Sequence, residues 1–190
     1  TPMPDKLCLL VCTIIRPEVD AVLAHEAWEN VIVRSFPARC GRTPLSSAKL
    51  EALTTDVSHA DKIEVLGSSC LCGLNPHADD ATHIHRLSQC LELLAPAECV
   101  ASHLETDAYL LSPGWLRDWR KHVSEWGFVR SQARSFFKEF AKHLVLLDTG
   151  IDPESQARLQ AFATFVNLPH SVDAVGLDTL RSALHDLVEE

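Results

Sequence analysis

The sequence predicts an α/β fold, a three-layer α/β/α sandwich built on a mainly parallel sheet. Short apolar runs rich in β-branched residues alternate with segments of helical periodicity along the whole chain, which is the order that βαβ units produce. The runs at 6–15, 63–66 and 144–147 are nearly continuous in apolar residues. Because strands covered on both faces have this character, we expect these three at the centre of the sheet.

The first half of the chain is predicted to hold three strands and three helices. The strand at 6–15 ends before Pro17, which suits the first turn of a helix. A helix is expected at 83–94 because Leu87, Cys90 and Leu91 recur on one helical face. In order, the expected elements are a strand at 6–15, a helix after Pro17, a strand at 31–36, a helix at 45–58, the strand at 63–66 and the helix at 83–94.

The second half repeats the alternation around a charged helical stretch. Ser112, Pro113, Gly114 and Trp115 are expected to form a turn, with Trp115 buried or, alternatively, serving as an aromatic wall for a ligand. The other expected elements are extended segments at 98–103 and 107–111, helices through 126 and at 130–142, a strand at 143–147, a helix after Pro153, a strand at 172–175 and a helix at 177–188.

The helical stretch around 115–142 is predicted to be an insertion in the α/β fold. We expect one domain over 1–190, which can alternatively be divided into two α/β halves, 6–111 and 143–188, joined by this helical segment. A chain of 190 residues is long enough to bury a full core without disulfides or structural metals.

Composition narrows the class of partner. The formal net charge is -9 and no basic stripe is present, so we expect no nucleic-acid partner. No apolar run approaches the roughly 18–20 residues of a membrane span, and no signal peptide opens the chain. We therefore expect a cytoplasmic protein that binds a small molecule or a metal and has no membrane partner.

Cysteine is the most informative residue type. The chain has seven cysteines, and an odd number without an export signal argues against a disulfide framework. Cys12 lies near the end of the first predicted strand, Cys40 just past the second, and Cys70 and Cys72 just past the third. Parallel strands align their carboxyl ends, so four thiols are expected at one sheet edge.

Two interpretations of these thiols stay open. Cys90, on the helix predicted to follow, is expected to face the same crevice. Several thiolates together suit zinc or an iron–sulfur cluster, whereas the plainer interpretation is that they are buried free thiols. Cys8 and Cys99 are expected to be core packing residues.

Two other candidate sites have weaker support. His77, His83 and His85, with Asp79 and Asp80 nearby, suggest either a histidine site or a solvated polar loop. Asp148 ends a predicted strand and precedes Thr149 and Gly150. A carboxylate in this position either orients a ligand or braces the turn.

The order of short motifs resembles that of the domain of unknown function 1638 family. The motifs are Cys12, Thr43-Pro44, Leu71-Cys72-Gly73, Cys90, YLLSPGW at 109–115 and LLDTG at 146–150, and the resemblance runs from about Lys6 to Leu187. It implies an α/β domain without an established activity, with members in organisms that carry out corrinoid-dependent methyl transfer.

The resemblance also implies a set of thiols. The family's recurring cysteines match Cys12, Cys72 and Cys90. The sequence departs from the family pattern before the third cysteine, where Ser88 and Gln89 stand in place of a His-Asp pair. A role that needs that histidine would pass to His83 or His85.

Three hypotheses follow for function, and none assigns a catalytic residue. In the first, a binding or sensing module holds an iron–sulfur cluster or zinc through Cys12, Cys72 and Cys90, with Cys40 or Cys70 as a fourth ligand. In the second, a zinc–thiolate enzyme or accessory factor serves corrinoid-linked methyl-group metabolism beside a methyltransferase or signalling partner. In the third, the thiols are structural and the crevice holds an organic ligand.

Overall fold

The computed structural model describes residues 6–57, 59–75 and 80–189. The chain forms two compact units. The first comprises Thr1–Cys90 together with Leu180–Glu190, and the second comprises Leu91–Thr179. From the sequence we expect one domain over 1–190 or, alternatively, two halves at 6–111 and 143–188. The first compact unit ends at Cys90 and also includes Leu180–Glu190.

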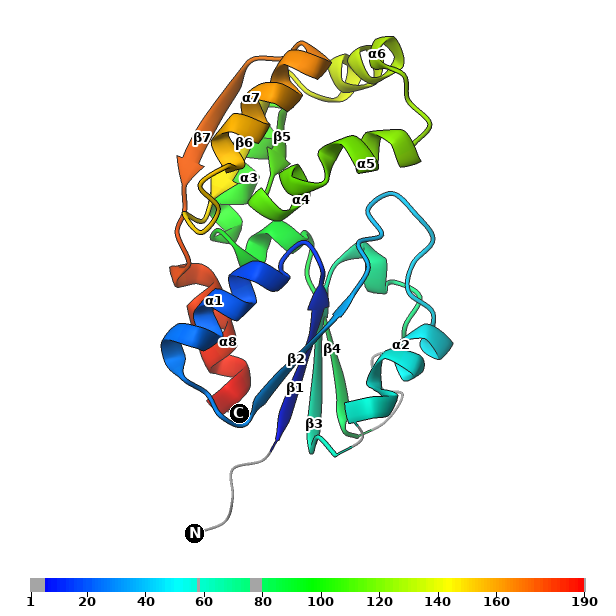
Figure 1. The fold of residues 1–190 in the computed structure, drawn as a ribbon, viewed down its shortest axis with the longest axis vertical. Helices are drawn as coiled ribbons and strands as arrows, with labels where there is room; N and C mark the ends of the chain where they lie inside the picture. The colour runs from blue at the N-terminus through cyan, green and yellow to red at the C-terminus, as the bar shows by residue number, and fades with distance from the viewer. Residues whose placement is uncertain (1–5, 58, 76–79, 190) are drawn as a thin grey trace. The chain divides into compact units, whose positions relative to one another are not determined.

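The first unit is built on a parallel four-stranded sheet in the order β2-β1-β3-β4. Helices α1 and α8 lie on one face of this sheet and α2 lies on the other (Figure 1). The elements are β1 (Leu7–Cys12), α1 (Arg16–Glu26), β2 (Val31–Phe36), α2 (Ser47–Thr54), β3 (Lys62–Gly67), β4 (Thr82–Arg86) and α8 (Asp178–Glu189), with 3-10 turns at Thr55–Val57, Ser69–Leu71 and Cys90–Leu93.

The apolar runs predict the central strands correctly. All six residues of β1 are buried, because the strand has helices on both faces and a neighbour along each edge. β3 lies between β1 and β4. Pro17 is in the first turn of α1, and Ser46 caps α2 by accepting a hydrogen bond from the backbone N–H of Lys49 at 3.3 Å.

The second unit has its own parallel sheet of three strands, in the order β5-β6-β7. Its central strand is β6, as the apolar run at 144–147 predicts. α3 packs against β5, and α7 packs against β6 and β7. The elements are α3 (Ala97–Glu105), β5 (Ala108–Leu111), α4 (Pro113–Arg117), α5 (Trp119–Glu125), α6 (Arg130–Phe140), β6 (His143–Asp148), α7 (Ser155–Val166) and β7 (His170–Ala174).

The expected α/β fold with parallel strands is confirmed, but the strands are divided between two sheets. The predicted helical stretch corresponds to α4, α5 and α6, which connect β5 to β6. Every strand pairing among the described residues is parallel.

Trp115 is buried, as the sequence predicts. It is 7% exposed, and its ring lies 5.2 Å from that of Phe162 and 5.1 Å from that of His122, centroid to centroid. The segment that contains it is the start of a helix rather than a turn. The Ser112 hydroxyl caps α4 by accepting a hydrogen bond from the Trp115 N–H at 3.2 Å, and Pro113 follows at the first helical position.

Two predicted elements are wrong. The helix expected at 83–94 is instead strand β4 followed by a 3-10 turn at Cys90–Leu93. Ile84 packs against the apolar core between two histidines that point the other way, which is the alternation of an edge strand. The extended segment expected at 98–103 is helix α3, which begins after Pro96, a residue that often precedes a helix start.

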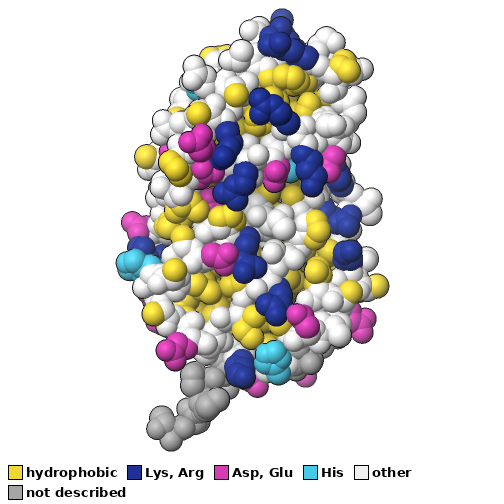
Figure 2. Space-filling model, viewed as in Figure 1, with side chains coloured by type: hydrophobic (Ala, Val, Ile, Leu, Met, Phe, Trp, Pro, Cys, Tyr) yellow, Lys and Arg dark blue, Asp and Glu magenta, His cyan; other side chains and the backbone are white. Residues whose placement is uncertain are grey.

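The surface carries charges of both signs. Lys and Arg side chains are spread over the visible face among acidic and hydrophobic ones (Figure 2). None of the helices in the described parts of the chain is both long enough and apolar enough to span a bilayer.

Candidate functional site: four cysteines at the ends of four parallel strands

Each strand of the first sheet has a cysteine at or just beyond its carboxyl end. Cys12 is the last residue of β1, and Cys40 lies in the loop after β2. Cys70 lies in the 3-10 turn after β3, and Cys90 begins the 3-10 turn after β4. Since the four strands are parallel, these strand-end cysteines occupy one edge of the sheet.

Backbone hydrogen bonds join the loops that carry these thiols. The N–H of Leu45, at the end of the Cys40 loop, donates to the carbonyl of Cys70 at 2.8 Å. The loop after β1 is joined to the end of β2, because the N–H of Thr13 donates to the Phe36 carbonyl at 2.9 Å. The loops therefore support one another instead of extending separately into solvent.

The segment that leads to Cys90 is held against the Cys70 turn in the same way. The Ser68 hydroxyl donates to the carbonyl of Ser88 at 3.1 Å. The N–H of Leu87 donates to the carbonyl of Gly67 at 2.8 Å. These two bonds bring the chain after β4 beside the chain after β3, so Cys90 lies near Cys70.

Gly67 allows the Cys70 turn to fold back tightly on β3. A Cβ atom at this position would lie 2.9 Å from Cγ and Cδ1 of Leu71 and 3.1 Å from Sγ of Cys70. Such approaches are too close for a side chain. A larger residue at the end of β3 would therefore push Leu71 and the Cys70 sulfur out of their present positions.

Cys70 and Cys90 form a hydrogen-bonded thiol pair. The Cys90 thiol donates to the Cys70 sulfur, and this bond, with backbone amides at Ser68 and Cys70, lowers the pKa of Cys70 to about 6 despite its burial. The same contact raises the pKa of Cys90, since its proton is held between the two sulfurs. Cys70 is therefore poised to be a thiolate near neutral pH.

Cys12 and Cys40 complete the cluster. Burial, together with negative charge at Cys40 and Cys70, raises the pKa of Cys12 to about 11. Although Cys40 is exposed as a residue, burial of its sulfur also raises its thiol pKa, with a contribution from charge at Cys70. Charges on Cys12 and Cys40 also act on Cys90. All four thiols are thus near enough to influence one another's ionisation.

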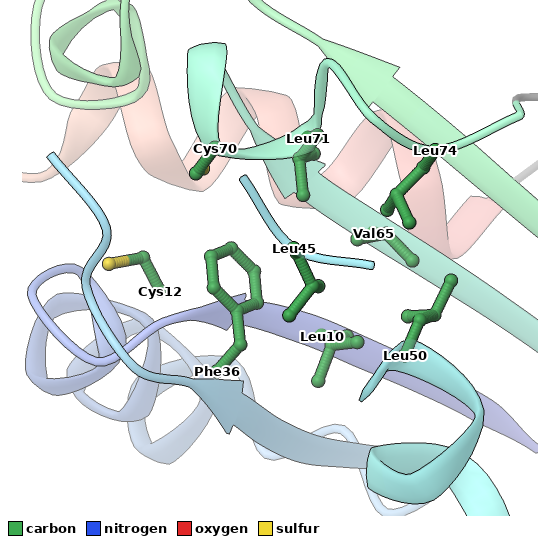
Figure 3. Packing of buried hydrophobic residues seen from close by; sticks show 9 residues of the cluster. All are labelled: Leu10, Cys12, Phe36, Leu45, Leu50, Val65, Cys70, Leu71 and Leu74. Atoms are coloured by element: carbon green, nitrogen blue, oxygen red, sulfur yellow. The ribbon is translucent and has the colours of Figure 1, made fainter. Parts of the chain in front are cut away.

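The thiols lie at one end of an apolar core. Cys12 and Cys70 are both 7% exposed and belong to a cluster with Phe36, Leu45 and Leu71. Figure 3 shows Cys12 and Cys70 at the same end of this cluster, with Leu50 and Leu74 at the other end. Low exposure limits access of water to the sulfurs and keeps the local dielectric low.

The other two cysteines of the first unit lie elsewhere. Cys72 follows the Cys70 turn and is exposed. The four strand-end cysteines contribute to one another's pKa shifts. Cys8 is fully buried in β1, which agrees with its expected packing role.

The histidines surround a carboxylate that sequence reasoning missed. Glu64 of β3 is 1% exposed and pairs with His83 at 3.0 Å, with Lys62 at 2.8 Å and also with His85. Burial alone would raise the pKa of Glu64, but these hydrogen bonds lower it below its usual value. His83 and His85 lie on the same side of a strand, so both reach Glu64.

The signal for this group was Glu64, a charged residue between Ile63 and Val65 in the otherwise apolar run at 63–66. His77 and Asp79 lie outside the described residues.

Asp148 braces a turn, as one of its two interpretations predicts. Its carboxylate accepts hydrogen bonds from the N–H of Gly150 and from the Gln156 side chain, each at 3.0 Å.

The spacing of the four sulfurs restricts what they can bind. Among residues 6–57, 59–75 and 80–189, the ligand atoms that form a group of three within 4.8 Å belong to other residues, Cys99, His103 and Asp173. No three sulfurs of the strand-end cysteines are mutually that close. The sulfurs around one zinc ion lie roughly 3.5–4 Å apart, so the cluster is wider than a closed zinc site.

The fold and the cluster define an α/β protein with a thiol-rich candidate site at the carboxyl edge of a parallel sheet. Residues 47–184 match the family model described as a protein of unknown function, DUF1638. The chain belongs to this family, as its motifs indicate. No curated protein and no solved structure matches the chain. The matched region includes Cys70, Cys72 and Cys90, whereas Cys12 and Cys40 precede it.

Proposed function

We propose that the first unit is a binding or sensing module that holds an iron–sulfur cluster through Cys12, Cys40, Cys70 and Cys90. The observation that carries this proposal is the placement of one thiol at the end of each of four parallel strands. Core packing alone does not require cysteine at four separate strand ends. Four convergent thiolates are the usual ligand set of a cluster.

The spacing and the ionisation of the four thiols support this group. The sulfurs are spread more widely than a single zinc ion needs, and cluster ligands lie about 6–7 Å apart. The low pKa of Cys70 provides one ligand that needs little energy to deprotonate. When bound, an iron–sulfur cluster supplies one-electron chemistry and sensitivity to oxygen, which suits a sensor.

The proposed ligand set differs from the one expected from the family resemblance. Cys70 takes the place of Cys72, because Cys70 is the buried thiol that contacts Cys90. Cys72 directly follows the 3-10 turn and is exposed, so it is accessible to solvent or to a partner protein.

A zinc–thiolate role in methyl-group metabolism is the second candidate. The observation that favours it is the lowered pKa of Cys70, since a thiolate held at neutral pH is both a zinc ligand and a nucleophile. In this case the protein would act beside a methyltransferase or signalling partner, with the sulfurs drawn together around the ion.

Purification without oxygen tests both candidates. Iron, acid-labile sulfide and zinc are measured per chain, and the absorption spectrum is recorded. Brown protein with stoichiometric iron and sulfide supports the cluster, and colourless protein with one zinc per chain supports the second candidate. Protein that is metal-free, and that binds neither group after anaerobic reconstitution, contradicts both.

A further inference from the structure

A second group of potential ligands lies in the second unit. Cys99 and His103 are four residues apart on α3, so both side chains lie on one helix face. Asp173 lies on β7, the strand beside β6. The sulfur of Cys99, a ring nitrogen of His103 and a carboxylate oxygen of Asp173 all lie within 4.8 Å of one another.

Cys99 and His103 both contact the same carboxylate oxygen of Asp173. Nε2 of His103 lies 2.8 Å from Oδ2 of Asp173, and the Cys99 thiol donates to the same oxygen at 3.5 Å. The edges of a zinc tetrahedron with mixed sulfur, nitrogen and oxygen ligands are about 3–4 Å long. Small side-chain rotations would place one ion at bonding distance from all three atoms.

The side chains of Cys99, His103 and Asp173 are partly buried and partly open to solvent. Cys99 packs against the core cluster that contains Val100 and Val145, so the helix is fixed relative to the sheet. The side chains of His103 and Asp173 are 26% and 38% exposed, which leaves access for an ion and for a further ligand. Burial and the Asp173 carboxylate raise the pKa of the Cys99 thiol, which keeps its proton in the metal-free protein.

We propose that Cys99, His103 and Asp173 form a metal site for a divalent transition ion such as zinc, with a fourth position open to water or an exogenous ligand. Sulfur, imidazole and carboxylate together suit zinc better than magnesium or calcium, which prefer oxygen ligands. On binding, the Cys99 sulfur loses its proton to solvent and forms the metal–sulfur bond.

The site is independent of the proposed cluster. It uses none of the strand-end cysteines and lies within the other compact unit. A negative result for the iron–sulfur cluster therefore does not affect the proposed metal site, and a negative result for the metal site does not affect the proposed cluster. Three protein ligands with an open position are the arrangement of catalytic rather than structural zinc sites.

The test is titration of the full-length, metal-free protein with Co²⁺ under anaerobic conditions. Thiolate coordination gives a ligand-to-metal charge-transfer band and tetrahedral cobalt gives strong visible absorption. We expect Cys99→Ser, His103→Ala and Asp173→Asn each to lose one equivalent of cobalt or to weaken its binding at least about tenfold. His170→Ala, an exposed histidine on the same strand, is the matched control and keeps wild-type binding.

Variants at the first site separate the two proposals. Cys70→Ser and Cys90→Ser are expected to keep the cobalt equivalent that depends on His103. If the three variants bind as much cobalt as the wild type, with unchanged affinity, the second site does not exist. If the His103-dependent signal disappears in Cys70→Ser, the site is not independent.

A measurement on the unmodified sequence covers the case in which a variant misfolds. Cys99 of the wild-type protein is alkylated with and without one equivalent of Zn²⁺, and the modified residue is identified by mass spectrometry. Zinc is expected to slow modification of Cys99 at least about tenfold while leaving that of the exposed Cys72 unchanged. Equal rates at Cys99 with and without zinc overturn the proposal.

Discussion

The Cys90 thiol donates a hydrogen bond to the sulfur of Cys70, and this contact lowers the pKa of Cys70 to about 6. The two residues are on loops that follow neighbouring parallel strands, β3 and β4. The bond between the Ser68 hydroxyl and the Ser88 carbonyl holds these loops together. The lowered pKa of Cys70 is therefore a consequence of how β4 pairs with β3.

Cys90→Ala is expected to raise the pKa of Cys70 from about 6 toward its ordinary value of 9.0, because the alanine has no proton to donate. The measurement is the rate of iodoacetamide modification at Cys70 as a function of pH, read by mass spectrometry on the metal-free protein. The midpoint should move to higher pH. Cys99→Ala, in the other unit, is the control, and an unchanged midpoint in Cys90→Ala would refute the contact.

Gly67→Ala is expected to destabilise the protein by about 1–3 kcal/mol, because the added Cβ meets Leu71 and the Cys70 sulfur. Denaturant unfolding measures the change in free energy. The control is a double-mutant cycle with Leu71→Ala, which removes the two closest atoms, Cγ and Cδ1 of Leu71, and leaves the Cys70 sulfur. Gly67→Ala should cost less in that background, and equal costs in both backgrounds would contradict the close approach.

Glu64→Gln is expected to lower the free energy of unfolding by about 1–3 kcal/mol at pH 7, since it removes a buried carboxylate that pairs with Lys62, His83 and His85. The folded-state pKa of Glu64 is lowered. Its ionised form therefore stabilises the fold above the unfolded pKa, about 4.5, and this contribution is lost as the pH falls through the folded value.

Denaturant unfolding between pH 3 and pH 8 checks this sign. The difference between the wild type and Glu64→Gln should shrink at acid pH. Glu51→Gln, on the exposed face of α2, is the control and should change stability by less than about 0.5 kcal/mol at every pH. A difference that grows at low pH would contradict the pairing of Glu64.

Trp115→Ala is expected to cost about 3–5 kcal/mol of stability, because the buried ring packs among Tyr109, His122 and Phe162. Thermal unfolding measures the effect. Phe140→Ala, at a residue that is 64% exposed, serves as the comparison and should leave the melting temperature nearly unchanged. A Trp115→Ala protein with the wild-type melting temperature would show that the ring is not part of the core.

The central strands were predictable from the sequence, and their division into two sheets was not. β1, β3 and β6 are covered by helices or neighbouring strands, so their residues are mostly apolar. This apolar character can be recognised in each of the three sequence segments. The pairing of strands is decided by long-range packing, which the local periodicity of the sequence does not specify. β4 was missed for a related reason. It is an edge strand with polar residues on one side, and its histidines became informative only when paired with Glu64.

The candidate site was predictable in position and less so in membership. The rule that parallel strands align their carboxyl ends predicts Cys12, Cys40 and Cys70 at one edge. Cys90 was expected there on a helix, and it is near the edge on a 3-10 turn instead. Whether Cys70 or Cys72 turns inward depends on the geometry of the short turn after Gly67, which the spacing of two nearby cysteines does not specify.

Comparing Cys70→Ser with Cys72→Ser tests whether Cys70, and not Cys72, is a ligand of the proposed cluster. Both variants are purified and reconstituted without oxygen, and iron and sulfide are measured per chain alongside the wild type. We expect Cys70→Ser to lose the cluster or to hold it with a much shorter lifetime in air, and Cys72→Ser to retain wild-type iron, sulfide and colour. Loss of the cluster in Cys72→Ser with full retention in Cys70→Ser would contradict it.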